Sequence, residues 1–388
     1  MIPRPRLVAS ALALAFSLVV LPDASAASTS ASPSAQDIAN LVQTHTGYPV
    51  KASVYATGLN NPRGLKFGPD GALYVAEGGR GGTHQTTPMQ CDQVPGVGPY
   101  SGSRTGGRIS RIDRHGHRVT ITNRFPSSQT SPQVGSLISG VADVAFIGHT
   151  LYALTAGAGC SHGVPGTFNG VARVDHDGTI HWIANLSAYQ KHHPVQNPEE
   201  EDFEPDGTWY SMVSLHGNLY ALEPNHGELV QVTTDGAIRR LVDISATQGH
   251  IVPTALAYRG NFFIGNLNTF PIVAGSSKVL KLTRNGQLWP VVNRLTTVVG
   301  LAFDCHGRMY ALEMSTGKDN PEPTPGTGKV VRIEPSGMRK TIISGLTLPT
   351  AMTFGPDGAL YVSNAGFGFP PGMGQVLRFD LDGWRHAP

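Results

Sequence analysis

Six polar residues recur along the chain at about the same point of a repeated apolar segment. They are Glu77, Thr155, Glu223, Asn266, Glu313 and Asn364. Carboxylate, amide and hydroxyl oxygens bind polar ligands and hard cations such as Ca²⁺. If the repeated segments meet around one axis, these side chains form a ring of ligand-binding groups at the mouth of a channel. The alternative is structural, because strands commonly end on polar residues.

A second concentration of titratable groups runs from His192 to Glu204 and reads HHPVQNPEEEDFE. Its carboxylates could bind Ca²⁺, but their spacing matches neither an EF-hand loop nor a zinc site. We favour an acidic, solvated loop as the interpretation of this insert. The chain has no GxSxG, HExxH or Walker-type phosphate loop, so no catalytic residue is predicted.

The polar residues belong to a repeat of about 50 residues, the length of one propeller blade. Its clearest copies are GLKFGPDGALYVAE, ending at Glu77, and AMTFGPDGALYVSN, ending at Asn364. After a variable loop, each copy continues into a strand of alternating apolar and polar residues followed by a glycine. These glycines are Gly116, Gly178, Gly236, Gly286, Gly337 and Gly383.

Six repeats with turn residues at their bends predict an all-β fold of antiparallel hairpins. We expect a six-bladed β-propeller of four-stranded antiparallel blades, formed by residues 51–388 as a single domain. The last repeat lacks a fourth strand, and residues 51–59, KASVYATGL, resemble the missing piece. We therefore predict that this N-terminal strand completes the last blade and closes the ring.

Propeller geometry divides the connections between two faces. The loops between second and third strands share one face, here called the long-loop face, with the connections that link successive blades. Long segments on it include Gly78 to Gly106 in blade 1 and Arg124 to Ser139 after blade 1, whereas the turns on the opposite face, here called the turn face, are tight. Long loops on a rigid scaffold usually carry the binding site, so we expect it on the long-loop face.

Three cysteines occur in the chain. Cys91 lies in the long loop of blade 1 and Cys160 in the equivalent loop of blade 2. Because neighbouring blades present these loops side by side, we predict a Cys91–Cys160 disulfide, which an oxidising compartment would favour. Cys305, in the turn FDCHG, is expected to be a free thiol. No CxxC motif is present, so no thiolate metal site is predicted.

Residues 1–26 have the pattern of a signal peptide, with a basic start, an apolar run and the cleavage motif Ala24-Ser25-Ala26. We predict a secreted, extracellular protein cleaved after Ala26, with no membrane span in the mature chain. Residues 27–50 are a Ser/Ala/Thr-rich lead that could include one short helix. The formal charge of +2 indicates no nucleic-acid partner, and we expect a monomer.

The segment GLNNPRGLKFGPDGALYVAEGGRGG, residues 58–82, resembles the ScyD/ScyE family of exported six-bladed propeller proteins. The resemblance extends over roughly residues 50–384. It includes a Cys-containing loop in blade 1, an insert with Asn197-Pro198 and the ending LPTAMTFGPDGALYVSNAG. The family implies a secreted propeller and supplies no catalytic residues. The blade motif itself is shared with NHL repeats and other, TolB-like propellers.

The blades also resemble those of Ca²⁺-dependent lactonases of the gluconolactonase and SMP-30-like type and of strictosidine-synthase-like enzymes. Such lactonases hold a divalent ion near the start of each blade's first strand. The corresponding positions here are Arg63, Asp143, Tyr210, Thr254, Val299 and Thr350. Only Asp143 is a carboxylate, which is too few hard ligands for a caged Ca²⁺. We count Arg63 and Asp143 with the predicted channel-mouth ring.

The sequence thus favours a binding or accessory module for a small molecule, a glycan or an extracellular protein on the long-loop face. The first alternative is a metal-dependent hydrolase or lactonase, in which a cation on the ring would polarise a carbonyl and activate water. The second is an extracellular structural or interaction protein. The sequence specifies no cofactor, and Ca²⁺ or another divalent cation is the one that the hydrolase would use.

Overall fold

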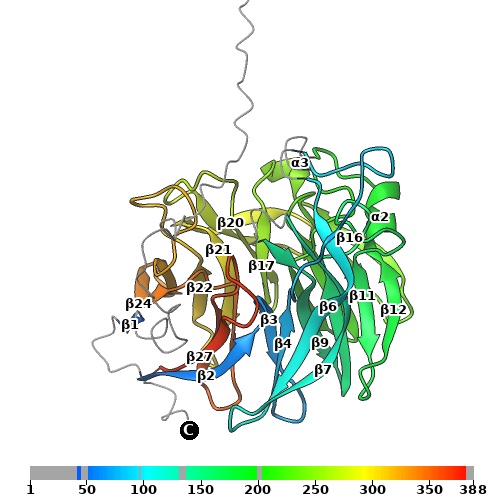
Figure 1. Ribbon diagram of the computed structural model, residues 1–388. Helices are drawn as coiled ribbons and strands as arrows, with labels where there is room; N and C mark the ends of the chain where they lie inside the picture. Colours follow the sequence, from blue (N-terminus) through cyan, green and yellow to red (C-terminus); the bar gives the residue numbers. More distant parts are fainter. Residues whose placement is uncertain (1–41, 45–50, 96–97, 131–136, 199–202, 382–388) are drawn as a thin grey trace, which may run out of the picture.

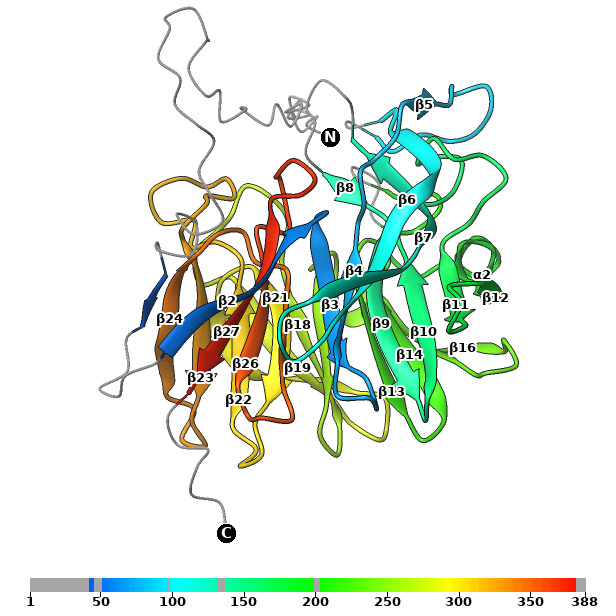
Figure 2. The same cartoon turned by 60° about the horizontal axis from the view of Figure 1, so that its bottom comes forward.

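A computed structural model describes residues 42–44, 51–95, 98–130, 137–198 and 203–381, and Figures 1 and 2 show it in two views. Antiparallel sheets follow one another around a central axis and confirm the six-bladed β-propeller. The predicted signal peptide and most of the lead lie outside the described residues. Within the lead, Gln43–Thr44 forms strand β1, which pairs with the outer strand of blade 5.

The four main strands of each blade follow one another from the axis outward. Blade 1 has β3 (Pro62–Phe67), β4 (Leu73–Glu77), β6 (Ser101–Ile112) and β7 (Arg118–Gln129), and blade 2 has β9 (Val141–Ile147), β10 (Thr150–Thr155), β11 (Gly170–Val174) and β12 (Ile180–Asn185). Blade 3 has β13 (Ser211–Leu215), β14 (Asn218–Glu223), β15 (Glu228–Val232) and β16 (Ile238–Asp243), and blade 4 has β17 (Pro253–Tyr258), β18 (Phe262–Asn266), β19 (Ser277–Leu282) and β20 (Leu288–Leu295). Blade 5 has β21 (Val298–Phe303), β22 (Met309–Glu313), β23 (Gly328–Ile333) and β24 (Arg339–Leu346), and blade 6 has β25 (Ala351–Phe354), β26 (Leu360–Asn364), β27 (Gly374–Asp380) and β2 (Lys51–Leu59).

The tight turn between the first two strands of blade 1 illustrates why the repeat folds as a hairpin. Gly71 adopts a positive φ of 73°, a conformation that favours glycine. The Asp70 carboxylate accepts a hydrogen bond from the Ala72 amide, and the Gly68 amide donates to the Ala72 carbonyl. Beyond the turn, Leu73 is fully buried against the core shared with blade 6. Short apolar strands of this kind are covered on both faces by neighbouring blades.

The N-terminal strand completes the last blade, as predicted. β2 pairs antiparallel with β27, with Lys51 opposite Asp380 at one end and Leu59 opposite Gly374 at the other. Leu59 is fully buried and contributes to the core between blades 6 and 1. The two ends of the propeller are therefore held in one sheet, which closes the ring without leaving β27 as an open edge (Figure 2).

Hydrogen bonds between neighbouring blades surround the axis. They are Met212 N to Asp143 Oδ2, Ser211 Oγ to Thr254 O, Thr254 Oγ1 to Val298 O and Thr350 Oγ1 to Pro62 O. In addition, the Tyr210 hydroxyl of blade 3 crosses the axis and donates to the Thr350 carbonyl of blade 6 at 3.0 Å. Tyr210 therefore divides the channel into an upper space, on the side of the long-loop face, and a lower space, on the side of the turn face.

The prediction that Gly78 to Gly106 and Arg124 to Ser139 are loops is wrong in part. β6 begins at Ser101, and β7 continues to Gln129, so the two strands form a long hairpin on the long-loop face. Ser101 lies opposite Gln129 in this ladder. The small strands β5 (His84–Gln85) and β8 (Ile138–Ser139) extend the same sheet, in the upper part of Figure 2. Serine-rich and glycine-rich segments give a weak strand signal. Here the segment forms a strand because it pairs with β7.

Candidate functional site

The predicted disulfide joins the long loops of blades 1 and 2. Cys91 and Cys160 are bonded, which confirms that pairing, and Cys305 is an exposed free cysteine. Beside the disulfide, Thr86 Oγ1 donates to the Cys160 carbonyl at 2.7 Å. The His84 ring also bonds to the Gly163 carbonyl at 2.8 Å. These cross-links make the two loops one wall of the long-loop face.

A pocket of about 200 Å³ lies against this wall at the upper mouth of the channel. Its walls are largely apolar and include Val141, Ala156, Trp209 and Phe367, with the Tyr210 ring also lining it. Polar residues line the same space as well, namely Arg63, Tyr100 and Glu204, together with Thr130, Ser139 and Thr208. An apolar cavity with a few convergent polar groups is the usual form of a small-molecule site.

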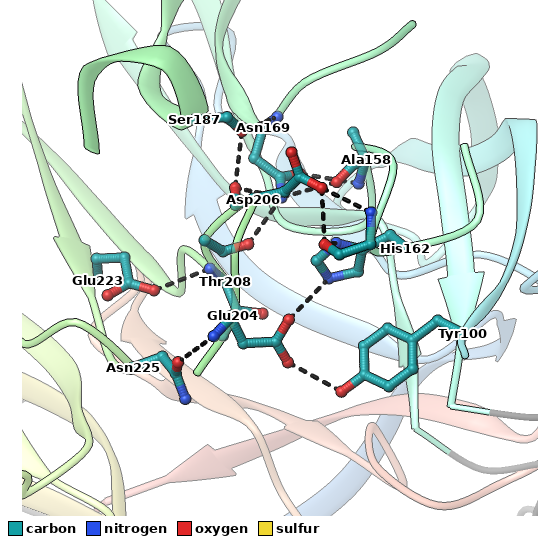
Figure 3. Close-up of polar contacts among 12 residues, drawn as sticks. Tyr100, Ala158, His162, Asn169, Ser187, Glu204, Asp206, Thr208, Glu223 and Asn225 are labelled. Carbon is teal, nitrogen blue, oxygen red and sulfur yellow. Dashed lines mark hydrogen bonds and ion pairs between the residues drawn. The ribbon is translucent and has the colours of Figure 1, made fainter. Parts of the chain in front are cut away.

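Glu204 is the centre of the polar network on one side of the pocket (Figure 3). Its Oε1 accepts a hydrogen bond from the Tyr100 hydroxyl at 2.9 Å, and its Oε2 lies 3.5 Å from Nε2 of His162. The Tyr100 and His162 rings pack edge to face, with centroids 5.2 Å apart. His162 is buried, and that burial lowers the pKa of its imidazole to about 4, so the ring is neutral at physiological pH.

The connection that carries Glu204 is fixed by hydrogen bonds on both sides. Asp206 Oδ2 accepts from the Ser161 hydroxyl and from the Ser161 amide, each at 2.7 Å. The Asn169 side chain donates to the carbonyls of Asp206 and Gly207. On the blade 3 side, the Glu204 amide donates to Asn225 Oδ1 at 2.8 Å. The carboxylate of Glu204 is thus positioned by residues from blades 2 and 3 (Figure 3).

Arg63 lies on a different part of the pocket wall, at the start of β3. Its Nη2 donates to the Ile138 carbonyl at 2.6 Å, and its Cζ lies 6.0 Å from the centroid of the Phe367 ring. Burial lowers the pKa of the Arg63 guanidinium, and the neighbouring Tyr210 hydroxyl opposes that shift. Burial also raises the pKa of Tyr210 to about 12. Arg63 remains a cation at neutral pH and Tyr210 remains a neutral donor.

Asp143, the other residue predicted near the axis, lies on the lower side of Tyr210. It lines a small cavity of about 20 Å³ and does not reach the upper pocket. Its carboxylate accepts from the Met212 and Val144 amides, and Lys66 Nζ is 4.0 Å away. A Cβ on Gly64 would lie 1.9 Å from Asp143 Oδ1, so only glycine leaves room for this carboxylate. Burial is the largest influence on Asp143 and raises its pKa.

The six predicted strand-end residues are buried at equivalent ends of the second strands. Four of them accept a hydrogen bond from a backbone amide of the connection that enters their blade. The pairs are Glu77 with Asn60, Glu223 with Thr208, Glu313 with Thr296 and Asn364 with Thr347. Asn266 instead donates to the Ile251 carbonyl of that connection, and Thr155 bonds to Gly170 on the next strand.

Two of the three glutamates in this group also have a cationic partner, and the third accepts a second backbone hydrogen bond. Arg108 pairs with Glu77 at 2.5 Å, and Lys329 Nζ lies 3.1 Å from Glu313. Glu223 also accepts from the His226 amide at 2.5 Å. None of the six residues lines the upper pocket. The contacts give each of them a structural role, and their role in ligand binding stays a prediction.

No motif in the sequence singles out Tyr100, His162 or Trp209, and Glu204 was predicted only as part of an acidic insert. One sequence signal points towards His162, because it follows Cys160 by two residues in the loop whose disulfide was predicted.

Residues 199–202 of the acidic insert lie outside the described residues, so the predicted acidic loop stays a prediction. Within the described chain, no three His, Cys, Asp or Glu side chains are grouped as a metal site. No helix of that part is long and apolar enough to cross a membrane.

The chain matches no family model and no curated protein. Among solved structures, it is similar to a glucose dehydrogenase, with a TM-score of 0.53 and 15% identity over 86% of this chain and 100% of that one. The PQQ-bound aldose sugar dehydrogenase from Streptomyces coelicolor gives a TM-score of 0.51 and 14% identity over 86% and 98%. A protein of unknown function from Bacteroides thetaiotaomicron gives 0.53 and 10% over 85% and 76%. At these identities the similarity shows the propeller fold alone.

Proposed function

We propose that this protein binds a small organic molecule in the upper pocket, on the long-loop face of the propeller. The observation that supports it is the convergence of Arg63, Tyr100 and Glu204 on a cavity with apolar walls. Wider grooves lie between the blades on the turn face, such as one of about 840 Å³ beside Asp70 and Arg111. Those two residues pair with each other, whereas the upper pocket combines enclosure with polar groups from several blades.

The cellular setting is part of the same proposal. The blade signature and the signal-peptide pattern favour a secreted accessory protein similar to the ScyD/ScyE family. The Cys91–Cys160 disulfide supports folding in an oxidising compartment. A small-molecule ligand suits the size of the pocket better than a glycan chain or a protein partner, which the sequence left open.

A second candidate function is hydrolysis of an ester or lactone in the same pocket. It is favoured by Glu204, whose carboxylate lines the pocket with the neutral ring of His162 beside it. Such a pair could accept a proton from water and return it to a leaving group. The metal-dependent form of this function, with a cation on the strand-end ring, is the alternative stated from the sequence.

The binding function can be tested through Trp209, which is buried and lines the pocket. A library of small polar organic molecules would be screened by thermal shift, and hits would be titrated by tryptophan fluorescence. We expect at least one saturable ligand whose affinity falls about tenfold or more in Ala156→Leu, because the larger side chain fills the pocket. Ala237→Leu, an exposed site in a hairpin turn of blade 3, is the matched control and should bind normally.

Two results would count against the proposal. One is that no compound in the library binds saturably. The other is that every ligand found binds equally well to Ala156→Leu. The hydrolase candidate predicts a further result, namely turnover of an ester or lactone that is lost in Glu204→Gln while binding is retained. Ligand binding without any turnover would leave the binding protein as the conclusion.

A further inference from the structure

We propose that the ligand of the upper pocket is an organic carboxylate whose anionic end binds Arg63. This inference rests on the proposed binding function and specifies the chemical class of the ligand. It follows from three features of the pocket. These are an arginine without an acidic partner among the described residues, apolar walls around it and an acceptor group at a separate position.

Arg63 differs from other arginines of the propeller in its partners. Arginines that pair with a carboxylate include Arg108 with Glu77, Arg111 with Asp70, Arg240 with Glu228, Arg308 with Asp304 and Arg378 with Asp357. Within the described residues, Arg63 has no such ion pair, and its polar neighbours are the Ile138 carbonyl and the Tyr210 hydroxyl. Among the described side chains, the guanidinium therefore has no carboxylate in ion-pair contact with it.

The shape of the guanidinium favours a carboxylate as the missing partner. It has five N–H donors in one plane, of which Ile138 and Tyr210 use only part. A carboxylate can accept two parallel hydrogen bonds from such a group, which gives both strength and orientation. Phe367 lies against Arg63 and limits the positions that the guanidinium can take. The low polarity of the surrounding walls strengthens the attraction between the two charges.

The rest of the pocket limits what else the ligand carries. Val141, Ala142 and Trp209 would contact an apolar body. Glu204 lines the same cavity, and a dianion such as a phosphate would be repelled by a second negative charge there. The Glu204 carboxylate and the Tyr100 hydroxyl can instead bond to a hydroxyl group of the ligand. A compact monocarboxylate with an apolar ring or chain fits these conditions.

The test compares benzoate with benzamide, which have the same size and differ in charge, by isothermal titration at constant ionic strength. We expect benzoate to bind at least about tenfold more tightly than benzamide, and 4-hydroxybenzoate to bind more tightly still. In Arg63→Gln, benzoate should bind no better than benzamide. Arg63→Lys keeps the charge without the planar donors and should recover only part of the preference. Arg104→Gln, an exposed arginine bonded to the Pro165 carbonyl, is the matched control.

The possible results separate this inference from the proposed function. Equal binding of benzoate and benzamide, both weakened by Ala156→Leu, would overturn the carboxylate class and leave the binding pocket in place. A benzoate preference that survives in folded Arg63→Gln would overturn the role of Arg63. If Arg63→Gln does not fold, the same comparison is made with Arg63→Lys, in which an unchanged preference would contradict the bidentate contact. No binding of either compound at millimolar concentration would overturn the carboxylate inference, whereas the proposed binding function would fall only if the library screen also found no ligand.

Discussion

Two buried carboxylates near the axis differ in what surrounds them. Glu204, above Tyr210, contacts a tyrosine hydroxyl and a neutral histidine at the edge of a pocket. Asp143, below Tyr210, is enclosed by blades 1 and 3, and its hydrogen bonds come from backbone amides. The geometry therefore gives Glu204 access to a ligand and makes Asp143 a structural link between two blades.

The raised pKa of Asp143 predicts a pH-dependent cost to stability. At pH values between 3.8, the pKa of this carboxyl in the unfolded chain, and its higher native pKa, Asp143 loses its proton in the unfolded state and keeps it in the native state. The contribution of Asp143 to stability therefore falls as pH rises through this window. Asp143→Asn should cost about 1–3 kcal/mol just above pH 3.8, because it loses one acceptor of a buried amide, and less at neutral pH. Urea unfolding of both proteins at the two pH values measures the difference, and a pH-independent difference would contradict the assignment.

At the residue scale, the sequence identified positions more reliably than roles. Glu77 and Asn364 were recognised as equivalent because they end the same repeated segment, and they do occupy equivalent places. Their partners are the amides of Asn60 and Thr347, in connections whose conformation no local pattern specifies. Arg63 could be placed at the start of a first strand, but only the three-dimensional structure shows that no described carboxylate pairs with it.

At the scale of elements, the disulfide connects the two loops that carry Tyr100 and His162. Cys91 and Cys160 close a segment with a sequence separation of 69 residues. Their link holds the loops in contact, together with the bond from Thr86 to the Cys160 carbonyl. The site therefore depends on a covalent constraint between neighbouring blades as well as on the strands beneath it.

Removing this link should weaken both stability and binding. In Cys91→Ser/Cys160→Ser, we expect the free energy of unfolding to fall by up to roughly 4 kcal/mol, because the unfolded chain regains the freedom of a long loop. Ligand affinity should fall as well, since Tyr100 and His162 lose their fixed spacing. Thermal and urea denaturation measure the first effect, and titration of a ligand found by the library screen measures the second. Cys305→Ser, at an exposed free cysteine, is the control; equal stability of the double variant and this control would contradict the prediction.

The elements of the fold could largely be predicted, and the exceptions have a physical reason. The Gly-Pro-Asp-Gly turn before Leu73 and the apolar second strands are local signals, so the blades were recognisable from the sequence. The segment from Ser101 to Gly106 was not, because serine and glycine are poor strand formers and the strand depends on pairing with β7. The contact of Tyr210 with Thr350 spans 140 residues, and no sequence pattern predicts it.

At the scale of the whole molecule, stability depends on how the ring is closed. Residues 51–59 and 374–380 come from opposite ends of the propeller and form one antiparallel pair. Hydrogen bonds around the axis and the Tyr210 contact across it add further links between blades. A ring closed by such a shared strand cannot open between blades 6 and 1 without breaking β-ladder hydrogen bonds.

A circular permutant can test whether sharing blade 6 between the two ends of the chain stabilises the ring beyond the local contacts of β2. Joining Leu381 to Lys51 by a short Gly/Ser turn and opening the chain between Gln248 and Gly249 would make every blade continuous in sequence. All strand pairs within the six blades remain possible, and only the two-residue β1–β24 pair is lost, so we expect a near-native far-UV circular dichroism spectrum. We also expect a lower melting temperature, because blades 3 and 4 then meet at a junction that no shared strand closes. A permutant opened between Cys305 and His306, in a turn within blade 5, keeps a shared blade and should melt close to the parent. Equal melting temperatures for all three proteins would show that the shared strand adds nothing beyond its local contacts.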